Sequence, residues 1–236
     1  IHLTVSYCLF WGSKVTTWDP IWEKIFQERK SWGQYPPEEL VRFFAQSYYQ
    51  VPDRTAIKVL EVGCGPGGGP AWFIAREGFS YTGIDGSSTA TTKAKTIFSG
   101  QNLQGEFVVG DLAELPWPDN HFDCVVDIAS LQCNSEEDTQ RIVSQIHRVM
   151  KPGGKHFSIS VSCGTWGDGS GEQLDPTTFK TITEGPLSGM GTIRFATRQS
   201  MLALYSEFNA IELNYSIRSM ENASHEIKHW VLTCVK

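Results

Sequence analysis

Short apolar segments alternate with amphipathic segments along most of the chain after residue 57. Val, Ile and aromatic residues dominate the apolar segments, which is typical of strands, and segment 136–150 carries its apolar residues on one helical face. Such an alternation favours an α/β, doubly wound parallel sheet with helices on both faces. The predicted strands are IKVLEVG (57–63), YTGID (81–85), EFVVGD (106–111), FDCVVDI (122–128) and KHFSISVS (155–162).

The last part of the chain departs from this alternation. After a predicted helix at 197–208, the strand patterns AIELNYSIRS (210–219) and EIKHWVLTCVK (226–236) are joined by only a few residues. So short a connection suits a hairpin, in which the last strand runs antiparallel to its neighbour. With the five earlier strands, this predicts a Rossmann-like, mostly parallel seven-stranded sheet with an antiparallel last strand.

The first 55 residues have helical patterns rather than strand patterns. Asp19 and Pro20 provide a helix start, and PPEELVRFFAQSYY (36–49) predicts a second helix that ends before Pro52. We therefore expect a helical N-terminal cap over 1–55 and the main domain over 56–236.

A long insertion, 163–195, separates the fifth predicted strand from the next helix. Long loops in compact domains are often functional. We expect this insertion and the N-terminal cap to form a pocket for a substrate. Trp166, Asp168 and Glu172 are its most chemically useful members.

Composition excludes several classes of function. The net charge is −6, from 20 basic and 26 acidic residues, which argues against a nucleic-acid surface. No stretch approaches the length of a membrane span, and IHLTVSYCLFWG (1–12) lacks the basic start of a signal peptide. The six cysteines are scattered without a C-x-x-C pair, which favours reduced thiols in the cytoplasm. We expect a small-molecule partner and neither nucleic acid, membrane nor metal, and a homo-oligomer stays open.

A glycine-rich turn follows the first predicted strand. In VLEVGCGPGGG (59–69), Gly63, Gly65 and Gly68 have the G-x-G-x-x-G spacing that holds the diphosphate of a dinucleotide. However, Glu61 stands two residues before the first glycine, where its charge would repel a diphosphate.

Four predicted strands end in acidic residues, which are Glu61, Asp85, Asp111 and Asp127. The carboxyl ends of parallel strands meet at one edge of the sheet, so these acids predict an anionic crevice. A ligand with a positive centre and ribose hydroxyls suits such a crevice, and S-adenosylmethionine has both. Asp85 could accept hydrogen bonds from its ribose diol and Asp111 from its adenine amino group.

Four segments resemble the motif series of the class I S-adenosylmethionine-dependent methyltransferases, small-molecule type. They are VLEVGCGPG, GID, GDLAELPWPDNHFDCVV and RVMKPGG, within residues 57–161. The resemblance implies that the IASLQ segment after Asp127 faces the methyl group and that Trp32 or Tyr35 closes over the cofactor. The cofactor-binding residues it implies are Trp32, Glu61, Gly63, Cys64, Gly65, Asp85, Gly86, Ser87, Asp111, Leu112, Asp127 and Ile128.

The chain departs from this family at two points. GSS follows Asp85, where the family usually has Ile or Leu plus Ser, so the adenine should pack differently here. LQCN (131–134) lacks the His that many members carry. His121, His147 and His156 are predicted to be surface or packing residues, so no catalytic base is assigned.

The function predicted is transfer of a methyl group from S-adenosylmethionine to an O or N atom of a small molecule, giving S-adenosylhomocysteine as the product. Two alternatives stay open. The same fold could transfer an aminopropyl group from the decarboxylated cofactor, or it could be a catalytically silent binding module.

Overall fold

The computed structural model describes residues 17–30 and 32–236. Cys8, Trp11 and the segment compared with a signal peptide lie outside these residues.

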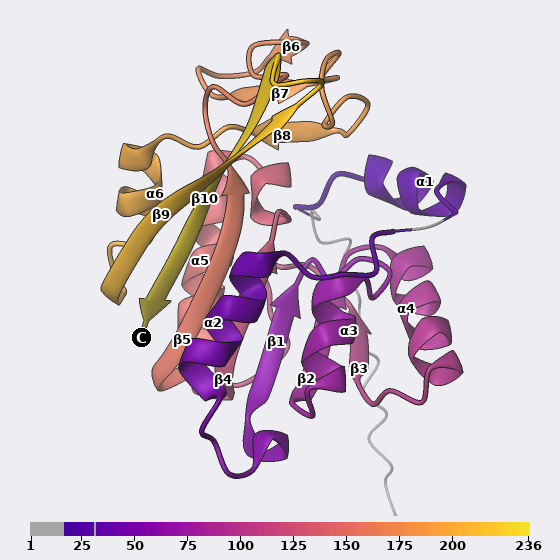
Figure 1. Ribbon diagram of the computed structural model, residues 1–236, viewed down its shortest axis with the longest axis vertical. Coiled ribbons are helices and arrows are strands. Elements are labelled where there is room, and N and C mark those ends of the chain that lie inside the picture. Colours follow the sequence, from indigo (N-terminus) through magenta and orange to yellow (C-terminus); the bar gives the residue numbers. More distant parts are fainter. Residues whose placement is uncertain (1–16, 31) are drawn as a thin grey trace, which may run out of the picture.

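A single seven-stranded sheet forms the centre of the molecule, in the order β3-β2-β1-β4-β5-β10-β9 (Figure 1). The first five strands pair in parallel, whereas β10 runs antiparallel to both β5 and β9. This confirms the predicted sheet and its antiparallel last strand. The strands are β1 (Lys58–Val62), β2 (Ser80–Asp85), β3 (Glu106–Val109), β4 (Phe122–Ile128), β5 (Met150–Val161), β9 (Asn209–Met220) and β10 (His225–Val235).

Helices cover both faces of the sheet because successive residues of each buried strand point to opposite sides. On one face, Val59 and Val126 belong to an apolar cluster with α2 (Glu38–Tyr48), α3 (Gly69–Arg76) and α4 (Ser88–Gly100). On the other, Leu60 and Val125 pack in a cluster with α5 (Glu136–Val149) and α6 (Arg198–Leu204). The sheet is therefore doubly wound, as predicted.

Local sequence explains where the helices begin. Ser135 accepts a hydrogen bond from the Asp138 N–H at 3.1 Å and so caps α5. Thr197 and Ser200 form a capping box at the start of α6. Helix α6 ends at Leu204, short of the predicted 208, because the following turn buries Tyr205 and Phe208 in the core beside α5.

The insertion 163–195 folds over the carboxyl ends of the parallel strands. It forms a small antiparallel sheet of β6 (Glu172–Gln173), β7 (Thr178–Lys180) and β8 (Thr192–Arg194) above the main sheet in Figure 1. Phe179, Ile182 and Ile193 give this sheet an apolar cluster of its own, together with Val161 and Phe195.

The first helix, α1 (Ile21–Glu28), lies over the same strand ends, beside the small sheet (Figure 1). The Asp19 carboxylate accepts a hydrogen bond from the Ile21 N–H at 3.1 Å, and α1 begins at Ile21 with Pro20 as its N-cap, one residue after the predicted start. Helix α2, by contrast, packs its Leu40 and Phe43 into the main core. Two short 3-10 turns, η1 (Arg54–Ala56) and η2 (Leu131–Cys133), complete the elements of the described residues.

Candidate active site

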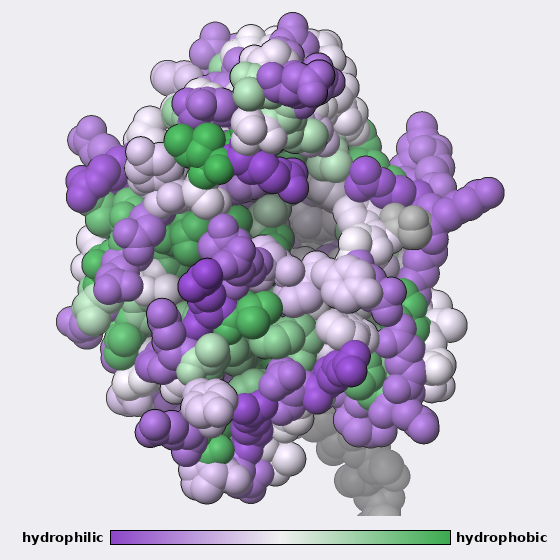
Figure 2. All heavy atoms as spheres, viewed as in Figure 1, coloured by the Kyte–Doolittle hydropathy of each residue, from purple (hydrophilic) through white to green (hydrophobic). Residues whose placement is uncertain are grey.

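A cavity of about 450 Å³ lies at the carboxyl ends of β1, β2 and β4. Its floor is the glycine turn and the strand ends, and its roof is α1 with the insertion. Figure 2 shows this face of the molecule hollowed between the lobe of the small sheet and the body below it. Ligands of open α/β sheets bind at this edge, so the cavity is the candidate active site.

The glycine turn brings bare backbone to the cavity. Gly63 and Gly65 have φ angles of 68° and 52°, in the left-handed region that favours glycine. A Cβ atom on Gly63 would lie 2.2 Å from the Cβ of Ser130, so a side chain cannot fit there. The turn therefore depends on glycine at its first position, and it leaves the wall of the cavity open to a ligand.

Asp85 ends β2 and lines the cavity although it is only 8% exposed. Its two carboxylate oxygens accept hydrogen bonds from the N–H groups of Gly65, at 2.9 Å, and Ser87, at 2.8 Å. Burial raises the pKa of Asp85, and these two bonds oppose that rise. The backbone thus fixes the carboxylate while each oxygen keeps a lone pair for a ligand hydroxyl.

Glu61 lies in β1 and lines the same part of the cavity at 4% exposure. The Tyr81 hydroxyl donates a hydrogen bond of 2.6 Å to its carboxyl group. Burial raises the pKa of Glu61 to about 8, helped by the charges of Asp127 and Asp85 and opposed by the Tyr81 bond. A cation bound in the cavity would favour the ionised form of this group.

Two of the acids expected at the strand ends do not line the cavity. Asp111 accepts hydrogen bonds from the Thr17 N–H, at 2.8 Å, from the Thr17 hydroxyl and from the Ala113 N–H. Asp127 is fully buried; it accepts from the N–H and hydroxyl of Ser130 and from the Ser158 hydroxyl. Both carboxylates therefore accept hydrogen bonds from protein groups and stabilise the segments that form the cavity wall.

Most of the other expected cofactor residues line the cavity, but Ser87 does not. Trp32, Cys64, Gly86, Leu112 and Ile128 line the cavity together with the glycines. Ser87 does not line it: its hydroxyl caps α4 at the Ala90 N–H and donates to Glu23 of α1 at 2.5 Å.

Trp32, rather than Tyr35, lies at the cavity. Tyr35 is 80% exposed and does not line it. The Trp32 indole packs against Phe26 with ring centroids 5.0 Å apart, and its buried Nε1–H has no hydrogen-bond partner among the described residues. An unpartnered buried donor at a cavity wall is costly unless a ligand accepts from it.

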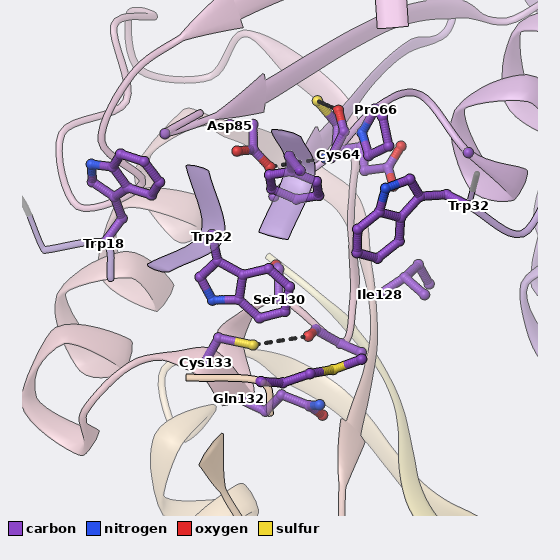
Figure 3. A pocket seen from close by; sticks show the side chains of 18 of the residues that line it. Trp18, Trp22, Trp32, Cys64, Pro66, Asp85, Ile128, Ser130, Gln132 and Cys133 are labelled. Atoms are coloured by element: carbon purple, nitrogen blue, oxygen red, sulfur yellow. Dashed lines mark hydrogen bonds between the residues drawn. The ribbon is translucent and has the colours of Figure 1, made fainter. Parts of the chain in front are cut away.

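The structure adds wall residues that the sequence patterns do not single out as ligand contacts. In the close view of Figure 3, Trp18 and Trp32 lie on opposite sides with Trp22 between them. The insertion contributes Pro186, Leu187, Met190 and Ile193, whereas Trp166, Asp168 and Glu172 do not line the cavity. Trp166 instead stacks on His225 with ring centroids 3.9 Å apart.

The segment after β4 forms one more wall and carries a strained residue. Ala129 has a φ of 62°, an uncommon conformation for a residue with a side chain. Its N–H donates to the Ile159 carbonyl at 2.8 Å, and the neighbouring Ser130 hydroxyl donates to the Val62 carbonyl at 2.8 Å. These bonds hold Ala129, Ser130 and Cys133 at the cavity.

Among the residues that the structure describes, the ionisable residues of the lining are Asp19, Glu61, Asp85 and two cysteines, and no Lys, Arg or His lines the cavity. A diphosphate would meet repulsion here, so the dinucleotide reading of the glycine spacing is not supported. In residues 17–30 and 32–236, no cluster of three or more His, Cys, Asp or Glu side chains could hold a metal ion.

These features fit S-adenosylmethionine. The carboxyls of Glu61 and Asp85 suit its positive centres and its ribose diol, and bare glycine backbone suits close approach of the methionyl part. The sheet with its antiparallel β10 and this site define the class I methyltransferase fold.

A family model described as a methyltransferase domain matches residues 59–154. This segment runs from β1 through α5 into β5 and includes the glycine turn with Glu61 and Asp85. For residues 59–154 this match confirms the resemblance to the S-adenosylmethionine-dependent methyltransferases that was predicted from the sequence.

Three curated relatives are similar over this region. A fatty-acid O-methyltransferase of Mycolicibacterium smegmatis is 36% identical over 123 residues, 50% of this chain and 43% of the relative. The sterol 24-C-methyltransferase ERG6A of Gibberella zeae is 37% identical over 110 residues, which are 45% of this chain and 28% of the relative. A probable chloroplastic tocopherol O-methyltransferase of Oryza sativa is 30% identical over 157 residues, which are 59% of this chain and 43% of the relative. The chain thus spans less than half of each relative's length.

Solved structures agree on the fold. A S-adenosylmethionine-dependent methyltransferase of Methanosarcina mazei has a TM-score of 0.63 at 21% identity, covering 87% of this chain and 99% of the other. The 1,6-didemethyltoxoflavin-N1-methyltransferase of Burkholderia thailandensis, solved with S-adenosylhomocysteine and its substrate, has a TM-score of 0.58 at 15% identity. It covers 84% of this chain and 78% of the other.

Proposed function

We propose that the protein transfers the methyl group of S-adenosylmethionine to an O or N atom of a small, predominantly apolar molecule. The observation that carries the proposal is the division of the cavity into two unlike parts. The part at β1 and β2 holds Glu61, Asp85 and the glycine turn, whereas the part under α1 and the insertion is largely apolar.

The apolar part suits an uncharged or largely hydrocarbon acceptor. Trp22, Leu187, Met190 and Ile193 line it, and the described part of the lining holds no Lys, Arg or His to pair with a strongly anionic substrate. The relatives named for fatty acids, sterols and tocopherol support an acceptor of this kind. One of those names specifies methylation at carbon, so a carbon acceptor is also included in the test below.

The residues of the chain bind the cofactor and the acceptor, orient them toward each other and exclude water. When bound, S-adenosylmethionine supplies a methyl group on a positively charged sulfur, which leaves as a neutral thioether when an acceptor lone pair takes the methyl. Gly63 and Gly65 admit the methionyl end, Asp85 accepts from the ribose, and Ile128 and Ala129 bring the end of β4 to the cavity. Correct alignment in a dry cavity provides much of the rate enhancement in such a displacement.

The lining offers few candidates for a catalytic base. Asp19, at the start of α1, is the carboxylate of the roof; it accepts from the Ile21 N–H and, at 3.3 Å, from the Thr192 hydroxyl. An amine of low pKa or an acceptor that is already ionised needs no base. We therefore assign no catalytic residue and expect an acceptor that is nucleophilic by itself.

We also propose the wider setting of this activity. Residues 1–55 act as a cap on a domain of residues 56–236, and the protein works in the cytoplasm without nucleic acid. The five described cysteines are free thiols, and the net charge of −6 disfavours phosphate backbones. No helix among the described residues is long and apolar enough to cross a membrane.

The first test is calorimetric titration with S-adenosylhomocysteine, with NADH as the parallel ligand. We expect binding of S-adenosylhomocysteine alone, and Asp85→Ala should weaken it by about ten- to one-hundred-fold, because a fixed acceptor for the ribose is lost. Asp119→Ala, a surface carboxylate beside Arg148, is the matched control. Binding of NADH alone would overturn the proposal.

The second test measures transfer of a labelled methyl group to oleic acid, a simple phenol, lanosterol and an alkylaniline. Product from any of these supports an apolar acceptor, and the labelled position distinguishes O, N and C. If S-adenosylhomocysteine binds but no candidate is methylated, the catalytically silent module becomes the better account. Tighter binding of decarboxylated S-adenosylmethionine, with transfer of its aminopropyl group, would favour the remaining alternative.

A further inference from the structure

Gly86 lacks the side chain that the resemblance to the methyltransferases leads us to expect at this position of the site. It directly follows Asp85 at the end of β2, at the position where the sequence departs from the Ile or Leu typical of the family. Gly86 lines the cavity but has no side chain to offer an adenine ring. The flat apolar contact that a purine needs must therefore come from elsewhere in the chain.

The indole of Trp18 occupies this gap. A Cβ atom on Gly86 would lie 2.6 Å from Cδ2 and 2.7 Å from Cγ of Trp18, so the ring packs directly on the glycine backbone. Trp18 is half-buried and lines the cavity together with Asp85 (Figure 3). One part of the ring is covered by Gly86, and another part remains available to a ligand.

The residues on either side of Trp18 hold the ring in place. Thr17 donates its N–H, at 2.8 Å, and its hydroxyl to Asp111, and Asp19 accepts from the Ile21 N–H at the start of α1. Further along α1, Glu23 accepts hydrogen bonds from the hydroxyls of Ser87, at 2.5 Å, and Thr89. The carboxyl ends of β2 and β3 and the start of α4 therefore clamp the segment that carries Trp18.

We propose that Trp18 supplies the aromatic platform on which the adenine of the cofactor packs, in place of the side chain that Gly86 lacks. The inference rests on the proposed use of S-adenosylmethionine. It also accounts for Asp111, whose carboxylate positions Thr17 and hence the ring. Leu112, the next residue, lines the cavity and gives the adenine a second apolar contact.

Calorimetric titration of Trp18 variants with S-adenosylhomocysteine tests the platform. Stacking of a base on an aromatic side chain predicts a loss of affinity of about ten- to one-hundred-fold in Trp18→Ala. Trp18→Phe should stay within about threefold of the unmodified protein, because a ring remains. Trp72→Ala, which removes a tryptophan that does not line the cavity, is the matched control.

A paired substitution separates the platform from a general structural role. Gly86→Ile alone should weaken binding, because its side chain collides with the indole. In Trp18→Ala the same Ile fills the vacated place, so the double variant Trp18→Ala/Gly86→Ile should recover most of the affinity. Thermal melts establish that each variant is folded. If Trp18→Ala does not fold, Trp18→Leu replaces it, because this variant keeps an apolar side chain without a ring and should show the same loss of affinity.

Two further readouts respond to the adenine alone. S-ribosylhomocysteine, which lacks the adenine, should bind Trp18→Ala and the unmodified protein equally. The tryptophan emission quenched by S-adenosylhomocysteine should be smaller in Trp18→Phe. Unchanged or tighter binding of S-adenosylhomocysteine by Trp18→Ala would overturn the platform while leaving the proposed function intact. Failure of the unmodified protein to bind S-adenosylhomocysteine would instead remove the proposed function itself.

Discussion

At the scale of single residues, the site concentrates acidic groups where water is largely excluded. Glu61, Asp85 and Asp127 are all buried at the ends of neighbouring strands, and burial raises the pKa of each carboxyl. Internal donors stabilise Asp85 and Asp127, whereas Glu61 has one side-chain donor, Tyr81. A cationic ligand is the remaining partner that this cluster favours.

The raised pKa of Glu61 predicts a loss of stability toward alkaline pH. Its value of about 8 in the folded protein exceeds the ordinary value of 4.5, so the folded chain holds a proton that the unfolded chain has released. The contribution of Glu61 to the free energy of unfolding is therefore fully present below about pH 4.5. It is lost as pH rises toward and through 8, by up to about 1.4 kcal/mol per pH unit. Glu61→Gln should remove this decline.

Urea denaturation at several values between about pH 5 and pH 8 measures the slope, which should level off above about pH 8 because both states are then ionised. The exposed Glu106→Gln is the control and should keep the slope of the unmodified protein. An unchanged slope in Glu61→Gln would show that this carboxyl is ionised in the folded state.

At the scale of elements, β5 carries a second buried ionisable group. His156 is fully buried, its Nδ1 lies 2.9 Å from the Val125 carbonyl of β4, and its ring stacks on Tyr205. The sequence expectation that this histidine is a packing residue fits its place in the core. It lies among the side chains between the sheet and the segment after α6.

His156 predicts a loss of stability toward acidic pH. Burial lowers its pKa from 6.5 to about 4, opposed by the bond to the Val125 carbonyl. The unfolded chain binds a proton that the folded chain excludes, so stability is present above about pH 6.5 and is lost as pH falls toward 4. The loss reaches about 1.4 kcal/mol per pH unit.

His156→Gln should flatten this acid limb while lowering stability at neutral pH, because the stacked ring is lost. Urea midpoints between about pH 4 and pH 7 measure it, with the half-exposed His225→Gln as the control. A variant that keeps the steep acid limb would assign it to other groups.

At the scale of the whole molecule, two segments far apart in the sequence meet over the sheet. The Thr192 hydroxyl of β8 donates to Asp19 at 3.3 Å, and a Cβ on Gly191 would lie 2.7 Å from Ile21 of α1. The insertion and α1 thus share the roof of the cavity. We propose that the strand ends below them bind the cofactor and that this roof selects the substrate.

This division predicts that the insertion controls acceptor choice. Leu187→Ala/Met190→Ala enlarges the apolar part, so we expect the KM for the best acceptor of the methyl-transfer panel to rise by about tenfold. Affinity for S-adenosylhomocysteine should stay within about threefold. Leu174→Ala, on the exposed surface of the same insertion, is the matched control.

Exchange of the whole insertion 163–195 for that of a relative extends the same prediction to acceptor preference. Steady-state kinetics with two acceptors and calorimetry with S-adenosylhomocysteine measure the two properties separately. If the acceptor preference stays the same, the insertion does not form the substrate pocket.

Local patterns predicted the strands and their chain order, but not where every element ends. β5 begins at Met150, before the KPGG segment, although its strand pattern starts at 155. Helix α6 ends at Leu204 because the aromatic side chains that follow are drawn into the core. In both places contacts with distant residues set the boundary, and such contacts leave no periodic signal in a short window.

The sequence by itself determined the parallel sheet, its antiparallel last strand and the glycine turn beside two acids. Those features depend on residue type and short-range order: alternation fixes strands and helices, and Gly63 permits a backbone that other residues clash with. Only the tertiary structure decided which acids face the cavity. Asp111 and Asp127 occupy the expected strand ends, yet protein donors from elsewhere in the fold take up their oxygens. The tertiary structure also decided the contact between Trp18 and Gly86. The segment before α1 lies over the sheet there, and no local pattern connects it with the end of β2.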